Sequence, residues 1–115
     1  MEQALLDRLA ITQVVNDWVL WSDSGDWPRF ATVWHDDGWM TATWFQGSAA
    51  EFQKARRAGF ERGVSIIHFL GGTTCEIAGT RAIAQTKMTI NQRASNAASS
   101  ASFAPGSTGS SRSFS

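Results

Sequence analysis

The spacing of the apolar residues changes once along this chain, and that change constrains the fold more than any other feature. Between residues 5 and 21, apolar side chains recur at three- and four-residue steps, which is typical of an amphipathic helix. The residues with this spacing are Leu5, Leu9, Ile11, Val15, Trp18 and Val19. Between residues 64 and 92, β-branched residues and alternation favour strands. Helices at the start and strands at the end predict an α+β fold, with helices packed on one face of a curved antiparallel sheet.

Turn and cap signals divide the middle of the chain. Asp26, followed by Trp27 and Pro28, predicts the capped start of a short second helix that ends near Trp34. A turn at 35–38 and a strand at 39–45 are expected next. Late in the chain, the strands expected are 64–70, 73–78 and 82–92, the last two joined in a hairpin at Gly79-Thr80.

A third helix is predicted from Ser48 to Gly63. Ser48 with Glu51 three residues later has the form of a capping box, and Gly63 is suited to the position after a helix end. Phe52 and Phe60 are expected to pack on the sheet. Three of the basic residues of this helix are expected to be largely solvated: Lys54, Arg56 and Arg57.

The composition changes abruptly near residue 93. Residues 1–93 hold all ten acidic and nine of the ten basic residues, whereas residues 94–115 hold nine Ser and no Val, Ile or Leu. Such a segment buries too little apolar area to offset its ordering entropy. We therefore expect one domain at 1–93 and a disordered tail at 94–115. The edge of the strand at 82–92 would then be exposed, favouring an oligomer or poor solubility.

Composition also limits the function classes. Ten basic side chains balance ten acidic ones, which argues against a nucleic-acid partner. No apolar run reaches the roughly 18 residues of a membrane span, so no membrane partner is expected. Cys75 is the only cysteine, which excludes an internal disulfide. A cytoplasmic protein is the default expectation. Six Trp and seven Phe beside no Tyr indicate an apolar cavity in addition to a core.

His68 is the residue best suited to chemistry. It shares one face of its predicted strand with Val64, Ile66 and Leu70. An imidazole on such a face can be a general base near neutral pH, or a core histidine whose nitrogens are satisfied by neighbours. Asp23, just after the first helix, can be its partner or a solvated turn residue. His35 and His68 lie too far apart for a helical zinc pair, and neither a metal nor a cofactor is expected.

The chain from residue 5 to residue 90 resembles the SnoaL-like branch of the nuclear transport factor 2-like (NTF2-like) superfamily. The segments that carry the resemblance are 10–17 (Ala-Ile-Thr-Gln-Val-Val-Asn-Asp), 23–27 (Asp-Ser-Gly-Asp-Trp), 30–39 (Phe-Ala-Thr-Val-Trp-His-Asp-Asp-Gly-Trp) and 67–69 (Ile-His-Phe). Within the superfamily the pattern is most similar to the scytalone dehydratase and hexachlorocyclohexane dehydrochlorinase type. The resemblance implies a cone-like α+β barrel, here with its C-terminal strands missing or replaced.

The resemblance also implies a site. Members of this type use a His–Asp dyad in a cone-shaped pocket, and the matching positions are His68 and Asp23. The implied activity is that of a lyase or isomerase acting on a small apolar substrate, cyclic molecules included. Alternation and resemblance together give the candidate pocket wall: Val19, Met40, Trp44, Met88 and Ile90. Trp39 is ambiguous, because a register slip of one residue exchanges the two faces of a strand.

A second interpretation belongs to a different class. Many members share the fold without a known reaction, so the same pocket can serve a non-catalytic ligand-binding or dimerisation module. The resemblance implies a homo-oligomer, a dimer or trimer formed through the outer face of the sheet. The dehydrochlorinase type also uses a late Arg on the leaving group, and Arg112 lies in too patternless a context to receive that role.

Overall fold

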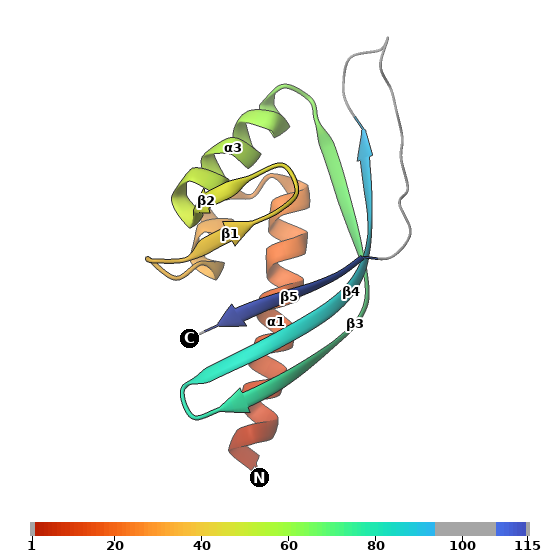
Figure 1. Ribbon diagram of the computed structural model, residues 1–115. Coiled ribbons are helices and arrows are strands. Elements are labelled where there is room, and N and C mark those ends of the chain that lie inside the picture. Colours follow the sequence, from red (N-terminus) through yellow and green to blue (C-terminus); the bar gives the residue numbers. More distant parts are fainter. Residues whose placement is uncertain (1, 94–107, 115) are drawn as a thin grey trace.

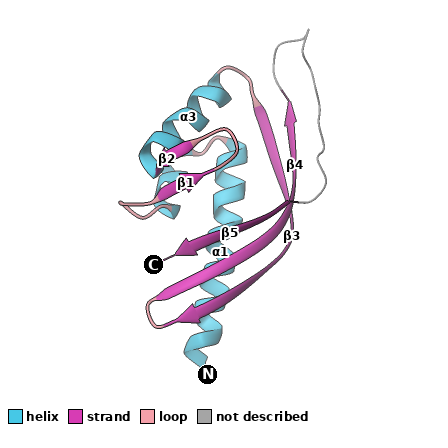
Figure 2. Ribbon diagram, viewed as in Figure 1, coloured by secondary structure: helices cyan, strands magenta, loops and turns pink. Residues whose placement is uncertain are grey.

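The computed structural model describes residues 2–93, together with the backbone of residues 108–114. Helices come first along the chain and long strands last, as the spacing predicts (Figure 2). The elements in order are α1 (Glu2–Ser24), α2 (Trp27–Phe30), the 3-10 helix η1 (Ala31–Val33), β1 (Trp39–Thr41), β2 (Gln46–Ser48), α3 (Ala49–Glu61), β3 (Ser65–Ala78), β4 (Arg81–Arg93) and β5 (Thr108–Phe114).

The strands form two antiparallel sheets. β1 and β2 make a small hairpin, and the larger sheet has the order β3-β4-β5. Figure 1 shows α1 running along the larger sheet, with α3 and the β1–β2 hairpin beside the C-terminal half of α1. The predicted α+β class is confirmed: helices pack on one side of a curved antiparallel sheet. Over the described residues, this sheet does not close into a barrel.

The curvature comes from a break in the register of β3 and β4. Leu70 pairs with Met88 and Thr73 with Thr86, so the register shifts between Leu70 and Thr73. Gly72 in this bulge has φ +125°, a conformation that favours glycine. The two strands predicted at 64–70 and 73–78 are therefore one bent strand, β3, and both long strands change direction together in Figure 1.

Burial along α1 differs from the expectation. The buried face carries Val15, Trp18, Val19 and Ser22, whereas Leu5 and Leu9 are 60% and 61% exposed. At about 100° per residue, Leu5 lies about a quarter turn from the centre of the buried face, and Leu9 lies farther still. The spacing predicted that all of these apolar residues lie on one buried face. In the structure, only those that face the core beside β3 are buried. No described helix combines the length and apolarity needed to cross a membrane.

Aromatic rings fill the core beside the sheet. Trp18, Val19, Phe30 and Phe52 form its buried centre. Phe52 stacks on Trp18 at 6.0 Å between ring centroids, and Phe60 meets Trp27 edge to face at 5.5 Å. The aromatic contacts of Phe52 and Phe60 are thus with rings of the helical region and of the β1–β2 hairpin, and Leu70 of β3 packs against the cluster that contains Phe52.

Both predicted helix caps are present. An Asp26 carboxylate oxygen accepts from the Arg29 backbone N–H at 3.3 Å, and Ser48 Oγ accepts from the Glu51 N–H at 3.1 Å. The strand predicted at 39–45 is instead the first arm of the β1–β2 hairpin, closed where the Ala42 N–H donates to the Phe45 carbonyl at 2.7 Å. Thr- and Trp-rich composition indicated a strand but not the turn within it.

The C-terminal region also differs from the expectation. Residues 94–107 lie outside the described residues, but β5 pairs with β4 from Ala82↔Phe114 to Met88↔Thr108. The expectation that residues 94–115 contain no strand is therefore wrong for 108–114. The edge of β4 offers a row of backbone N–H and C=O groups, and pairing with them requires no β-branched side chain. β5 covers this edge over residues 82–88, so that stretch is not the exposed edge that was expected.

Candidate active site

Asp23 and His68 meet between the last turn of α1 and the first half of β3. His68 Nδ1 lies 2.7 Å from Asp23 Oδ1, and the His68 backbone N–H donates to Asp23 Oδ2 at 2.7 Å. Their side chains are only 7% (His68) and 15% (Asp23) exposed. The two side chains that the resemblance paired across 45 positions are thus in direct contact.

The contact fixes the state of the imidazole ring. An ionised carboxylate can only accept hydrogen bonds, so Nδ1 carries the proton that lies between the two groups. In a neutral ring, the lone pair is then on Nε2. Within the described part of the chain, Asp23 is the only hydrogen-bond partner of the His68 ring. The Trp18 and His68 rings lie edge to face, with 5.6 Å between their centroids and an interplanar angle of 89°.

Local structure explains how each partner is placed. α1 ends at Ser24, and Gly25 turns the chain with φ +75°; a Cβ there would lie 2.6 Å from Phe60 Cζ. This stop leaves Asp23 in the last turn of α1, facing β3. Among the described strands, β3 lies at the edge of its sheet, so the inner face of β3 presents the His68 ring and its outer edge presents the His68 N–H. Asp23 satisfies both groups with its two oxygens.

Arg56 of α3 is the residue that sequence reasoning missed. It is 3% exposed, whereas Lys54 and Arg57 are exposed as expected. Arg56 Nη2 donates to the Ser22 carbonyl at 3.3 Å. Burial lowers the pKa of Arg56, and the negative charge of Asp23 opposes that effect. A helical signal could have found it, because Ala49, Phe52 and Arg56 recur at three- and four-residue steps on one face.

The five candidate wall residues fall into different environments. Val19 and Met88 are buried, at 4% and 6% exposure, while Met40 and Ile90 are half-buried. Ile90 is the register partner of His68. Trp44 is 55% exposed in the β1–β2 turn, so it is the least suited to an enclosed wall. Trp39 points outward at 66% exposure, which resolves the register ambiguity in favour of Met40.

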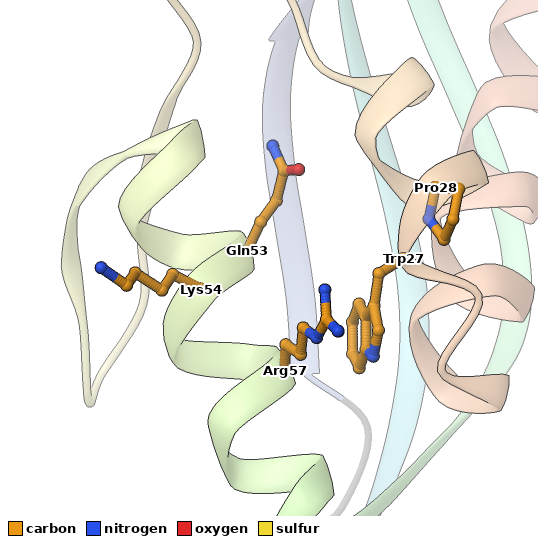
Figure 3. A pocket seen from close by; sticks show the side chains of 5 residues that line it. All are labelled: Trp27, Pro28, Gln53, Lys54 and Arg57. Carbon is orange, nitrogen blue, oxygen red and sulfur yellow. The ribbon is translucent and has the colours of Figure 1, made fainter.

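A surface pocket of about 360 Å³ lies between α2 and α3. Figure 3 shows the Arg57 side chain of α3 beside the Trp27 ring, with Pro28 on the same side as Trp27, in α2. A second hollow, of about 300 Å³, lies between the N-terminal half of α1 and the β3–β4 turn. Neither hollow is lined by Asp23, His68 or a candidate wall residue, so the buried contact rather than a hollow locates the candidate site.

His35 and Cys75 lie apart from the Asp23–His68 contact and interact with other residues. His35 Nδ1 contacts Asp37 Oδ1 in the exposed turn before β1. Cys75 is buried on β3, and Arg8 Nη1 donates to its carbonyl at 2.9 Å. Among the described residues, no three His, Cys, Asp or Glu side chains are grouped closely enough to hold a metal ion.

Two curated proteins are similar to this chain in sequence. Pea pathogenicity protein 2 of Fusarium vanettenii is 34% identical over 92 residues, which cover 76% of this chain and 39% of that protein. A PEP2-like protein of the same organism is 30% identical over 95 residues, covering 80% of this chain and 41% of that one. The chain thus spans about two fifths of the length of these curated relatives.

Solved structures share the fold at low identity. A protein of unknown function from Mycobacterium tuberculosis superposes with a TM-score of 0.77 at 15% identity, covering 97% of this chain and 64% of that one. An NTF2-like protein with a cystatin-like fold from Novosphingobium aromaticivorans superposes with a TM-score of 0.68 at 22% identity, covering 98% and 75%. The family model of the SnoaL-like domain matches residues 3–109. The chain therefore belongs to the SnoaL-like domain family.

Proposed function

We propose that this domain is a lyase or isomerase in which His68 removes a proton from carbon and Asp23 orients His68. The single observation that carries the proposal is the pair of hydrogen bonds between Asp23 and His68. Asp23 Oδ1 lies 2.7 Å from the ring nitrogen Nδ1, and Asp23 Oδ2 lies 2.7 Å from the backbone nitrogen. A carboxylate on Nδ1 directs the lone pair of Nε2 outward and stabilises the imidazolium once it forms.

The reaction that fits is an elimination. His68 Nε2 takes a proton from one carbon of the substrate, and the electrons of that C–H bond form a double bond to the neighbouring carbon. The group on that neighbour leaves with its own electron pair, as halide or hydroxide. If the proton is returned to another carbon instead, the same step gives an isomerisation. Apolar neighbours such as Trp18 and Ile90 favour a small apolar substrate, cyclic molecules included.

One observation favours a second candidate function, a non-catalytic ligand-binding or dimerisation module. The bond from the His68 N–H to Asp23 Oδ2 is also a way to fasten an edge strand to a helix. In that case the ring contact would serve only the fold. The two candidates differ in what they require of the imidazole, because only the enzyme needs a basic Nε2.

The test combines binding and proton transfer. Small cyclic alcohols, halides and ketones are screened by thermal shift, because a ligand of the folded state raises its stability. Each compound that binds is then incubated in D₂O, and its C–H signals are followed by NMR for exchange or loss. The proposal expects exchange or elimination with the unchanged protein and with His35→Gln, but none with His68→Gln, which still binds. Equal turnover by His68→Gln, or binding without any exchange in the unchanged protein, would overturn it.

A further inference from the structure

The surface pocket between α2 and α3 lies apart from the candidate active site. It holds about 360 Å³, and its lining comes from Trp27 and Pro28 of α2 and from Gln53, Lys54 and Arg57 of α3. One wall of the pocket is therefore aromatic and apolar, and the other wall carries an amide and two cationic groups. No acidic side chain is among the lining residues.

The Trp27 wall is held in place by its neighbours. The Trp27 ring meets Phe30 edge to face at 5.8 Å and Phe60 edge to face at 5.5 Å between centroids. The guanidinium carbon of Arg56 lies 5.9 Å from the centroid of the same ring. Trp27 is only half-buried, so part of its ring remains accessible. A side chain that is already fixed loses little conformational entropy when a ligand binds, which makes Trp27 a preorganised surface.

The opposite wall offers hydrogen-bond donors. Gln53 and Arg57 are four residues apart and share one face of α3. Figure 3 shows Arg57 beside the Trp27 ring, whereas the Lys54 side chain extends away from that ring. Arg57 Nε donates to Glu61 Oε1 at 2.9 Å. A guanidinium has five N–H donors, so this bond holds Arg57 and leaves the N–H groups of both Nη atoms for a ligand.

The charge around the pocket is positive. Lys54 is exposed and forms no ion pair among the described residues. Two acidic residues lie nearby in sequence or contact, and each is already paired with a cation. Glu61 pairs with Arg57 at 2.9 Å, and Asp26, which precedes Trp27, pairs with Arg29 at 3.6 Å. An anion that enters the pocket therefore meets positive charge that no carboxylate of the lining neutralises.

We propose that this pocket binds a small aromatic carboxylate, with the ring of the ligand against Trp27 and Pro28 and its carboxylate on Arg57. An aromatic ring packs favourably on an indole, and the planar guanidinium matches the two oxygens of a carboxylate. The amide of Gln53 supplies a further donor on the same wall. A volume of about 360 Å³ is at the lower end of the range for small-molecule sites, which favours a ligand with a single ring. This site and the proposed function do not depend on each other.

The test is a ¹H–¹⁵N NMR titration of the full chain with benzoate. We expect the Trp27 indole N–H and the Gln53 side-chain amide to shift with a Kd on the order of 1 mM, because a ligand of this size has few atoms to contribute. The indole of Trp39, which is 66% exposed on β1, is an internal reference and should not shift. Benzyl alcohol has the ring without the charge, and inorganic phosphate has the charge without the ring. Both should bind about tenfold more weakly than benzoate, or weaker still.

The variants test the role of Arg57. Arg57→Met should weaken benzoate binding about tenfold or more, the loss expected for a hydrogen bond between charged groups. Because this change leaves Glu61 without its partner, the double variant Arg57→Met with Glu61→Gln removes the guanidinium and the carboxylate together, and it should show the same loss. Both residues are exposed, so the fold should persist. Arg81→Met is the matched control, since Arg81 is an exposed cation that lines the other hollow, and it should leave benzoate binding unchanged.

The outcomes separate this pocket from the candidate active site. His68→Gln should bind benzoate as the unchanged protein does. Benzoate binding that disappears in His68→Gln would place the ligand in the candidate active site and overturn the inference. Equal affinities for benzoate and benzyl alcohol, or full benzoate affinity in the double variant, would overturn it as well. Benzoate binding at Trp27 and Gln53 in a protein that shows no proton transfer would support the inference and count against the proposed function alone.

Discussion

Replacing Asp23 by Asn changes one oxygen for an NH₂ group and is the sharpest perturbation of the candidate site. Asp23 accepts two hydrogen bonds from His68, one from the backbone N–H and one from the ring. An asparagine can accept only with its single oxygen. If that oxygen keeps the bond to the backbone N–H, the NH₂ group faces Nδ1 and must donate to it. The proton of the ring then moves to Nε2, where the proposed base needs a lone pair.

The magnitudes follow from these two bonds. A hydrogen bond to a charged group contributes about 1.5–3 kcal/mol, and the amide regains about 0.5–1.5 kcal/mol through its new donor bond. The free energy of unfolding should therefore fall by about 1–2 kcal/mol, which leaves the protein folded. Activity should fall roughly 10⁴-fold, the order of loss seen when an orienting carboxylate is changed and the imidazole adopts the wrong tautomer.

The assay reads the tautomer directly. Long-range ¹H–¹⁵N correlation spectra show which ring nitrogen carries the proton, and urea unfolding gives the stability change. Asp37→Asn is the matched control, because Asp37 contacts His35 in an exposed turn and should leave both His68 and the stability unchanged. If Asp23→Asn is folded and His68 still carries its proton on Nδ1, the argument from donors and acceptors fails.

Two further predictions concern α3 and are measured by urea unfolding. Ser48→Ala removes the bond from the Glu51 N–H to Ser48 Oγ and should reduce the free energy of unfolding by about 1 kcal/mol; an unchanged value would mean that the cap does not stabilise the helix. Phe52→Ala should cost about 3–5 kcal/mol, because Phe52 is 2% exposed among Trp18 and its neighbours. Phe60→Ala, at 37% exposure, should cost clearly less, and equal costs would contradict the assigned core.

Local sequence signals predicted the elements well where the cause of the element is itself local. The Asp26 and Ser48 caps each involve residues within four positions of one another. The residue types at those positions were therefore enough to predict the caps. The β-branched stretch around His68 likewise predicted a strand. The bend at the bulge between Leu70 and Thr73 was missed, because it depends on how β3 and β4 align and not on either strand alone.

Long-range effects account for the two larger differences. β5 forms at 108–114 because its backbone pairs with the edge of β4. The composition of residues 94–115 gives no information about that distant strand, so it could not predict β5. Arg56 was expected in solvent because each basic residue was considered by itself. Its position on the face that carries Ala49 and Phe52 was visible in the sequence, but the compensating partners, Ser22 and Asp23, lie more than thirty residues away.

The pairing of Asp23 with His68 came from the family resemblance and not from residue physics, since neither residue type alone distinguishes a site from a turn or a core. The structure adds a reason for that pairing. One carboxylate both satisfies the N–H of an edge strand and orients the imidazole on the same residue. The docking of β3 on α1 and the direction of Nε2 are therefore set by the same two bonds. A change that loosens the end of α1 would disturb strand and base together, so the fold of this region and its proposed chemistry depend on a single side chain.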